Sequence, residues 1–353
     1  MRVLVTGGAG FIGSAVVRRL VSEGHDVLNF DLMTYAGDER AVAICAGKPN
    51  YGFVKGDVAD PAAVSAAFES FQPEYVMHLA AETHVDRSID GPSAFIRTNL
   101  TGTAVMLECA LAYWKSLSQS ARAAFRMLHV STDEVYGSLG PDDPAFLETT
   151  PYAPNSPYAA SKAGADHLAR AWQVTYGLPV VISNCSNNYG PFQHPEKLIP
   201  TVIRKALAGD PIPVYGRGEN VRDWLHVDDH VTGLLVAMTR GTPGEKYNFG
   251  GNAERRNIDL VRELCRQIDD AFPAPDGPRA DRIQFVTDRP GHDHRYAVDA
   301  GKAKAELGWT PATPLNEGLR ATVAWYLQNP AWLARDPSEL ARLGLGRGDA
   351  AAE

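Results

Sequence analysis

Two adjacent acids, Asp133 and Glu134, follow an apolar run at 124–130 and two hydroxyl side chains, Ser131 and Thr132. Adjacent residues of a regular strand point to opposite faces, so the acids can share one pocket only where the strand has become a loop. When two close carboxylates occupy a shielded pocket, the pKa of one rises, which places a proton donor beside a proton acceptor. The alternative is a solvated turn with no chemical role.

A tyrosine and a lysine, Tyr158 and Lys162, stand four residues apart in Y-A-A-S-K. On a helix this spacing places both side chains on one face. A nearby ammonium lowers the pKa of a phenol, so that the tyrosinate can remove a proton from an alcohol. The alternative is an exposed pair on an ordinary helix, and the motif gains weight only beside a second functional motif.

The segment T-G-G-A-G-F-I-G at 6–13 supplies that second motif. Gly7, Gly10 and Gly13 lie between a predicted strand and a predicted helix, the context in which such glycines bind a dinucleotide. Asp31 ends the next predicted strand, where a carboxylate accepts hydrogen bonds from an adenosine ribose and repels a 2′-phosphate. The segment therefore predicts NAD rather than NADP. The alternative is a glycine-rich turn with a capping aspartate.

The elements that must position these residues alternate along the first half of the chain. Apolar runs predict strands, and helical periodicity predicts helices between them. The expected strands cover 2–6, 26–31, 51–57, 75–80, 124–130 and 178–184, and the expected helices cover 11–24, 61–71, 93–115 and 156–176. This alternation predicts an α/β fold, a doubly wound parallel Rossmann sheet.

After residue 185, prolines cluster and the alternation stops. We expect residues 1–185 to form an NAD-binding Rossmann domain, which segments near 222–245 and 289–300 rejoin. Residues 186–330 are expected to form a smaller, mixed α/β lobe that binds the substrate. Residues 331–353 are expected to form a C-terminal tail.

The composition is that of an ordinary globular protein, with 44% hydrophobic and 22% charged residues. The formal net charge of −8 argues against a broad nucleic-acid surface. No apolar run approaches the roughly 20 residues that span a membrane. The four cysteines form no CxxC pair and no metal-ligand spacing, which favours a reducing, cytoplasmic location.

Longer stretches resemble one enzyme family. The glycine-rich segment, Y-A-A-S-K and the S-T pair resemble the extended short-chain dehydrogenase/reductases. Within them the chain resembles the dTDP-glucose 4,6-dehydratases, over residues 1 to about 330. The matching stretches are D-L-M-T-Y-A-G at 31–37, H-L-A-A-E-T-H-V-D-R-S-I at 78–89, S-T-D-E-V-Y-G at 131–137, N-C-S-N-N-Y-G-P at 184–191, P-E-K-L-I-P at 195–200, R-D-W-L at 222–225 and R-P-G-H-D at 289–293.

This resemblance implies that the chain is a lyase that dehydrates dTDP-glucose to dTDP-4-keto-6-deoxyglucose with bound NAD. Tyr158, aided by Thr132 and Lys162, removes the C4 hydroxyl proton. Glu134 removes the C5 proton and Asp133 protonates the departing C6 hydroxyl, although the residues alone leave the order of these two acids open. Contacts to NAD are implied for Gly7, Gly10, Phe11, Ile12, Gly13, Asp31, Thr34, Asp57, Val58, Leu79, Ala80, Ala81, Thr98, Tyr158 and Lys162.

The resemblance also implies a pocket for the nucleotide diphosphate sugar in the second lobe. The implied substrate contacts are His84, Thr132, Asn188, Lys197, Leu198, Pro213, Tyr215, Arg222, Asn257 and His292. The alternative for any one of them is a structural role, and for Asp57 it is a helix-capping turn. His226 and His294 stand where relatives often carry Tyr and Arg, which puts substrate affinity slightly in doubt.

Two segments, H-V-D-D-H at 226–230 and H-D-H at 292–294, have the look of metal ligands. The family chemistry uses no metal. We instead expect Asp228 or Asp229 to cap a helix that begins near residue 229.

Three alternatives stay open. A UDP-sugar 4,6-dehydratase differs only in the base, since thymine and uracil differ by one methyl. A 4-epimerase or a decarboxylase would share the fold, although the acidic pair argues against the epimerase. A non-catalytic NAD-sensing protein need not keep the acidic pair together with the Tyr-Lys pair. By resemblance we also expect a homodimer, formed by the helices near 95–115 and 156–176 as a four-helix bundle.

Overall fold

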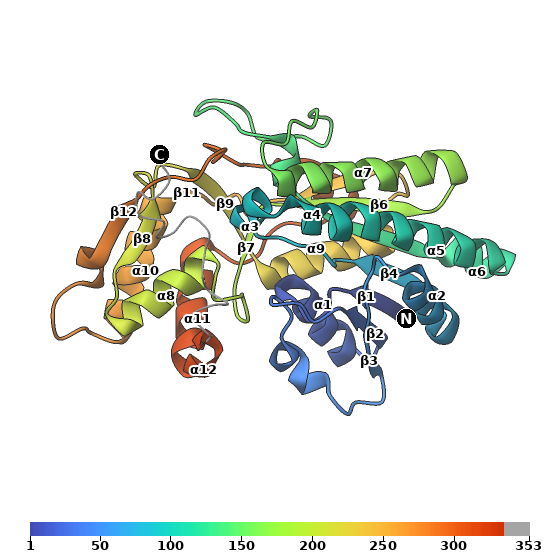
Figure 1. Ribbon diagram of the computed structural model, residues 1–353, viewed down its shortest axis with the longest axis horizontal. Coiled ribbons are helices and arrows are strands. Elements are labelled where there is room, and N and C mark those ends of the chain that lie inside the picture. The colour runs from blue at the N-terminus through green and yellow to red at the C-terminus, as the bar shows by residue number, and fades with distance from the viewer. Residues whose placement is uncertain (335–353) are drawn as a thin grey trace.

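The computed structural model describes residues 1–334 of the chain (Figure 1). Its larger part is a seven-stranded sheet with the strand order β10-β6-β5-β4-β1-β2-β3, in which every pair of neighbours is parallel. The strands are β1 (Arg2–Thr6), β2 (Asp26–Asp31), β3 (Tyr51–Lys55), β4 (Tyr75–His78), β5 (Arg126–Thr132), β6 (Val180–Cys185) and β10 (Lys246–Phe249). The predicted doubly wound α/β sheet is confirmed.

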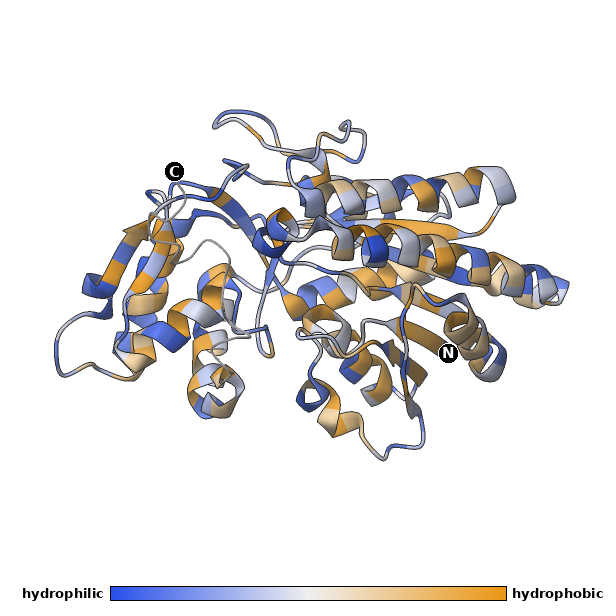
Figure 2. Cartoon of the chain, viewed as in Figure 1, coloured by the Kyte–Doolittle hydropathy of each residue, from blue (hydrophilic) through white to orange (hydrophobic). Residues whose placement is uncertain are grey.

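Successive residues of the central strands face two different layers of helices. In β1, Val3 and Val5 pack into a core with α1 (Phe11–Ser22) and α9 (Val227–Arg240). Leu4, between them, packs into the opposite core with the helices α2 (Pro61–Phe71), α5 (Gly102–Ser116) and α7 (Pro157–Tyr176). Burial on both faces explains why the strands are almost continuously apolar. Figure 2 shows this concentration of hydrophobic residues on the sheet.

The second lobe, at the left of Figure 1, combines two small sheets with helices. One sheet has the order β11-β9-β7 and the other pairs β12 with β8. The strands are β7 (Asn187–Tyr189), β8 (Ile212–Tyr215), β9 (Val221–His226), β11 (Glu254–Arg256) and β12 (Ile283–Val286). The helices are α8 (Leu198–Ala208), α10 (Asn257–Ala271), α11 (Leu315–Gln328) and α12 (Pro330–Leu333). The predicted mixed character of this lobe is confirmed.

The predicted tail begins with α12, whose Trp332 and Leu333 are buried in the core of the second lobe. The rest of that tail, from residue 335, lies outside the described residues. The remaining short elements are η1 (Glu39–Cys45), α3 (Val85–Asp90), α6 (Gln119–Ala124), η3 (Asp133–Tyr136), η4 (Arg279–Arg282) and η5 (Ala303–Leu307). Among residues 1–334, no helix is both long and apolar enough to cross a membrane.

The helix predicted near 93–115 is built in three parts. Helix α4 (Pro92–Phe95) continues into the π-helical turn η2 (Ile96–Thr101) and then into α5. A π turn inserts an extra residue and so re-aims its side chains, often beside a functional site. Here Asn99 accepts a hydrogen bond from the Glu82 N–H (2.8 Å) and donates one to the Glu82 carbonyl (3.0 Å), which fixes the segment after β4.

Several predicted boundaries differ from the structure by one or two residues, and two of these differences lie at the site. Strand β5 continues to Thr132, two residues beyond the predicted end, because Ser131 and Thr132 still pair with β6. Helix α9 begins at Val227, and its cap is His226, whose Nδ1 accepts from the Asp228 N–H (3.3 Å). Asp229 caps nothing in α9, since its carboxylate accepts N–H groups of the segment before α11.

Candidate active site

A cavity lies at the carboxyl ends of β1, β2, β4, β5 and β6. The strand order reverses there, between β1 and β4, and ligands of open α/β sheets bind at such a point. Its wall includes the predicted catalytic residues Thr132, Asp133, Glu134, Tyr158 and Lys162. It also includes the predicted cofactor residues Gly7, Gly10, Phe11, Ile12, Gly13, Asp31, Thr34, Asp57, Val58, Leu79, Ala80, Ala81 and Thr98.

The glycine-rich loop is shaped by close backbone contacts. A Cβ on Gly13 would stand 2.1 Å from the Gly7 carbonyl oxygen, and a Cβ on Gly7 would stand 2.7 Å from the backbone of Ala80. Gly7 also has a positive φ of 70°, which disfavours other residues. The loop places the N-terminus of α1 at the cavity wall, and no side chain caps that helix at Gly10. Its first N–H groups and its dipole therefore suit a pyrophosphate.

Asp31 ties β2 to the glycine-rich loop. Its Oδ2 accepts from the Ala9 N–H (2.9 Å), and its Oδ1 accepts from the Met33 N–H (2.8 Å). Burial raises the pKa of Asp31, and the two N–H groups oppose that rise. Carboxylate oxygens have lone pairs to spare after one bond each, so Asp31 can still accept from a ribose.

Asp57 lies in the turn that precedes α2, but the residue that caps this helix is Asp60. The Oδ1 of Asp57 accepts from the Ala59 N–H (2.8 Å) within that turn, and its Oδ2 contacts Arg97 Nη2 at 2.6 Å. The residue still lines the cavity beside Val58.

The acid pair occupies the turn that ends β5. Asp133 opens η3, and the Thr132 hydroxyl accepts from the Glu134 N–H (3.3 Å) while it donates to Asp133 Oδ1 (3.2 Å). The side chain of Asp133 is buried, and within residues 1–334 its Oδ2 has no hydrogen-bond partner. Asp133 therefore stands in a shielded turn rather than a solvated one, beside a half-buried Glu134.

The two acids have unequal surroundings. Burial, and then the Glu134 carboxylate, raise the pKa of Asp133 well above its ordinary value. Burial also raises the pKa of Glu134, but Arg289, Arg222 and then Lys197 oppose that rise. Of the two, Asp133 is the one that favours the protonated form and Glu134 the one that favours the ionised form.

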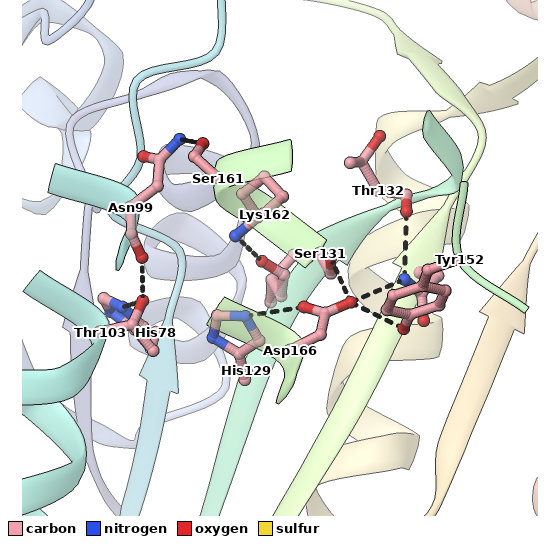
Figure 3. Close-up of polar contacts among 12 residues, drawn as sticks. His78, Asn99, Thr103, His129, Ser131, Thr132, Tyr152, Ser161, Lys162 and Asp166 are labelled. Atoms are coloured by element: carbon pink, nitrogen blue, oxygen red, sulfur yellow. Dashed lines mark hydrogen bonds and ion pairs between the residues drawn. The ribbon is translucent and has the colours of Figure 1, made fainter. Parts of the chain in front are cut away.

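Helix α7 presents Tyr158 and Lys162 to the same cavity. The helix begins after Ser156, whose hydroxyl accepts from the Ala159 N–H (3.1 Å). Lys162 is buried, and its Nζ donates to the Val130 carbonyl at 2.8 Å, which Figure 3 shows. The α7 face thus docks on the end of β5.

The expected lowering of the Tyr158 pKa was wrong. Burial, followed by the Glu134 carboxylate, raises the pKa of Tyr158 well above its ordinary value, while a hydrogen bond with Thr132 lowers it. Burial also lowers the pKa of Lys162, and Asp166 opposes that change. The spacing of four residues correctly predicted that Tyr158 and Lys162 share one face of a helix, but it could not predict how deeply the two side chains are buried.

The predicted substrate contacts separate into two groups. Thr132, Asn188 and Lys197 line the cavity. The structure does not place the others on the wall of that cavity, as far as residues 1–334 define it; these are His84, Leu198, Pro213, Tyr215, Arg222, Asn257 and His292.

Several residues of the second group already have protein partners. The Tyr215 hydroxyl donates to Asp86 (2.8 Å), and His292 Nδ1 lies 2.6 Å from Asp288. Buried Arg222 donates to the Asp293 carbonyl (3.0 Å), yet its charge acts on Glu134. Of these three residues, Arg222 is the one whose charge reaches the acid pair.

Some wall residues were missed or left without a role. They are Thr83, Ser186, Asn187, Gln193, His194 and Glu196, and Arg289 acts on Glu134 from the second lobe. Glu196 and Arg289 stand inside P-E-K-L-I-P and R-P-G-H-D, so the motifs themselves could have indicated them.

Three side chains of the H-V-D-D-H segment, which had the look of metal ligands, make hydrogen bonds within the fold. His226 caps α9, Asp229 accepts from the N–H groups of Ala312 and Thr313, and His230 contacts Asn188 at 2.9 Å. The side chain of His294, in the other segment, is exposed.

Comparison with known proteins agrees with this geometry. A family model described as GDP-mannose 4,6 dehydratase matches residues 4–322. Together with the cavity at the sheet switch point, this match defines the class of the protein, the extended short-chain dehydrogenase/reductases.

Individual relatives place the chain in one family within this class. A "Probable dTDP-glucose 4,6-dehydratase" of Sinorhizobium fredii is 58% identical over 332 residues, 94% of each chain. A dTDP-glucose 4,6-dehydratase of Xanthomonas campestris is 56% identical over 331 residues, again 94% of each chain. The crystal structure of DesIV, a dTDP-glucose 4,6-dehydratase of Streptomyces venezuelae with NAD bound, has a TM-score of 0.85 at 43% identity and covers 94% of this chain and 98% of that one. The chain belongs to the dTDP-glucose 4,6-dehydratase family.

Proposed function

We propose that this chain dehydrates dTDP-glucose to dTDP-4-keto-6-deoxyglucose, with NAD as a bound hydride carrier. The observation that carries the proposal is the acid pair, buried Asp133 and half-buried Glu134, on the same cavity wall as Tyr158 and Lys162. An epimerase needs no acid and base for elimination. The identity to named dehydratases over 94% of the chain supports the same conclusion.

NAD, when bound, accepts a hydride from the sugar and later returns it. The residues that would hold it are the glycine-rich loop, the start of α1 and Asp31, whose geometry suits a pyrophosphate and a ribose. Such a carrier ends the cycle as it began, so the reaction needs no second substrate.

Tyr158 is proposed as the base for the C4 hydroxyl. Burial and the Glu134 carboxylate raise the pKa of this phenol, and its hydrogen bond with Thr132 opposes that rise. The Lys162 ammonium, held on the Val130 carbonyl, adds positive charge on the same helix face. These groups prepare the sugar for loss of its C4 hydrogen.

Glu134 and Asp133 are proposed as the eliminating pair. A C4 ketone makes the neighbouring C5–H acidic, and Glu134, favoured as the carboxylate by nearby cations, would remove that proton. Asp133, which favours its protonated form, would protonate the departing C6 hydroxyl. Water is then lost across C5 and C6, and return of the hydride to C6 and of a proton to C5 would give the 4-keto-6-deoxy sugar.

Product masses test the proposal. Purified protein is incubated separately with dTDP-glucose and UDP-glucose, and the products are weighed. Loss of one water from dTDP-glucose alone supports a dehydratase that prefers thymine. Loss of water from both substrates would support a dTDP-sugar and a UDP-sugar dehydratase equally. An unchanged mass with galactose in the sugar analysis would make the chain a 4-epimerase and reject the roles of the acid pair.

The glycine-rich loop gives a prediction for cofactor affinity. Gly13→Ala places a methyl against the Gly7 carbonyl, so the loop must shift. Overpacking of this kind costs about 1–3 kcal/mol, and we expect NAD to bind about 10-fold or more weakly by calorimetry. Gly91→Ala is the control, because its Cβ would meet only ordinary contact at 3.7 Å. Equal NAD affinity in both variants would contradict the loop's role.

The acid pair predicts a bell-shaped dependence of kcat on pH. Glu134 must be ionised, and its pKa is raised, so activity falls on the acid side at a pH above the ordinary glutamate value of about 4.3. Asp133 must be protonated, so activity falls again as the pH rises through its raised pKa. The apparent pKa values of the two limbs belong to the two interacting acids together and not to either acid alone. A kcat that falls only near pH 4 and shows no alkaline limb would refute this assignment.

We also propose a homodimer, a cytoplasmic location and a domain division near residue 185. Ile96 in η2 and Val174 in α7 are large apolar side chains that are 51% and 62% exposed, which supports pairing through this face. Sedimentation equilibrium tests the dimer.

The packing of α9 and β10 on the Rossmann sheet supports a first domain that is rejoined after residue 185.

A further inference from the structure

Asp166 is a buried carboxylate with no part in the reaction as proposed. It lies one helical turn beyond Lys162 on α7, and its side chain is 1% exposed. It accepts hydrogen bonds from His129 Nε2 (3.1 Å), Ser131 Oγ (2.8 Å), the Tyr152 hydroxyl (2.8 Å) and Asn184 Nδ2 (3.3 Å), as Figure 3 shows. A buried charge is tolerated when it is hydrogen-bonded in this way.

These bonds reach the strand end that carries the acid pair. Ser131 lies directly before Thr132, and it pairs across the sheet with Asn184. Asn184 Nδ2 donates to the Thr132 carbonyl (3.0 Å) as well as to Asp166. One carboxylate therefore holds β5 and β6 together at the residues from which η3 departs.

The same carboxylate supplies negative charge beside Lys162. Asp166 raises the pKa of Lys162 against the effect of burial. The other titratable groups that face the two residues are His78 on β4, His129 on β5, Tyr136 in η3, Tyr152 before α7, Cys185 on β6 and Lys246 on β10.

None of those groups can replace Asp166 as an anion. Burial lowers the pKa of His78 and of His129, so both favour the neutral form. Burial raises the pKa of Tyr136 and of Cys185, which are then neutral as well. Burial alone would raise the pKa of Asp166, but His129, Lys162 and Ser131 together lower it, so Asp166 favours the ionised form.

We propose that Asp166 is a positioning residue for the dehydration: it fixes the Ser131-Thr132 strand end through Asn184, and it sets a negative charge one helical turn from Lys162 on α7. This inference rests on the proposed function, because it gives Lys162 and Thr132 their roles there. It assigns no contact of Asp166 with substrate or cofactor, since the structure places Asp166 outside the wall of the main cavity.

The test compares Asp166→Asn, which keeps the shape, with Asp166→Glu, which keeps the charge. Nitrogen NMR of ¹⁵N-lysine-labelled protein follows the Lys162 Nζ, assigned by its loss in Lys162→Met. We expect the pKa of Lys162 to lie lower in Asp166→Asn than in wild type and to be largely restored in Asp166→Glu. We expect kcat for dTDP-glucose to fall about 10- to 100-fold in Asp166→Asn, with KM within about twofold.

Tyr152→Phe is the matched control, because it removes one hydrogen bond to Asp166 and leaves the charge. It should leave the Lys162 titration unchanged. An unchanged Lys162 titration in folded Asp166→Asn overturns the proposal, even if stability falls. If Asp166→Asn does not fold, a Lys162 pKa that is lower in Asp166→Glu than in wild type overturns the proposal. A wild-type Lys162 that loses its proton below about pH 7 overturns it as well.

The NMR readout needs no substrate, so it is independent of the proposed function. Wild type that turns over no dTDP-glucose rejects the proposed function, whereas wild type that is active while the Asp166→Asn variant keeps its kcat rejects only the positioning role.

Discussion

Glu134→Gln is expected to stop the reaction after oxidation at C4. The amide keeps the shape of the side chain but cannot accept the C5 proton, so kcat for water loss should fall about 10²- to 10⁴-fold. The Glu134 carboxylate raises the pKa of Tyr158, so its removal should not slow the first step. Reduced nicotinamide should therefore accumulate after dTDP-glucose is added, measured by its near-ultraviolet absorbance.

Glu148→Gln is the control for this variant. Glu148 is also a partly buried glutamate with a raised pKa, but it lies outside the main cavity and accepts from the Asn248 N–H (2.9 Å). Its kcat should stay within about threefold of wild type, since it makes no transition-state contact. If Glu134→Gln released water at the wild-type rate, another group would have to be the base.

Tyr158→Phe is expected to block the reaction one step earlier. Without the phenol nothing at this position can take the C4 hydroxyl proton, so kcat should fall about 10²- to 10⁴-fold. No reduced nicotinamide should then accumulate, which distinguishes this variant from Glu134→Gln. KM should change little, because the ring that lines the cavity remains.

Tyr136→Phe serves as the control for the loss of a buried hydroxyl. Tyr136 is buried, and its hydroxyl donates to Asn248 (2.9 Å) away from the main cavity. We expect a loss of about 1 kcal/mol in stability and no comparable loss in kcat. Accumulated reduced nicotinamide in Tyr158→Phe would show that another base takes the C4 proton.

Much of the Rossmann half could be predicted because its signals are local. The apolar runs at 2–6 and 26–31 are buried on both faces, and such runs have few other folded forms. The loop with Gly7, Gly10 and Gly13 was recognisable because glycine is required where a Cβ would meet backbone. The strand end at Thr132 was misplaced by two residues, because only pairing with β6 extends β5 that far.

The electrostatics of the site could not be predicted from the order of residues. The acids stand next to each other in the chain, but their surroundings come from distant segments: Arg222 and Arg289 act on Glu134 from the second lobe. The effect of a charge depends on its distance and on burial, and neither can be read from spacing along a chain. For the same reason the pKa of Tyr158 moved opposite to the prediction from Lys162.

The sequence by itself determined the class of fold, the glycine-rich loop and the candidate catalytic groups, because each rests on a short run of neighbouring residues. Only the tertiary structure decided which acid favours its proton, what restrains Lys162, and that Asp166 joins β5, β6 and α7 beneath the cavity. Those properties depend on groups far apart in the chain, which become neighbours only when the sheet has closed and both helix layers have packed against it.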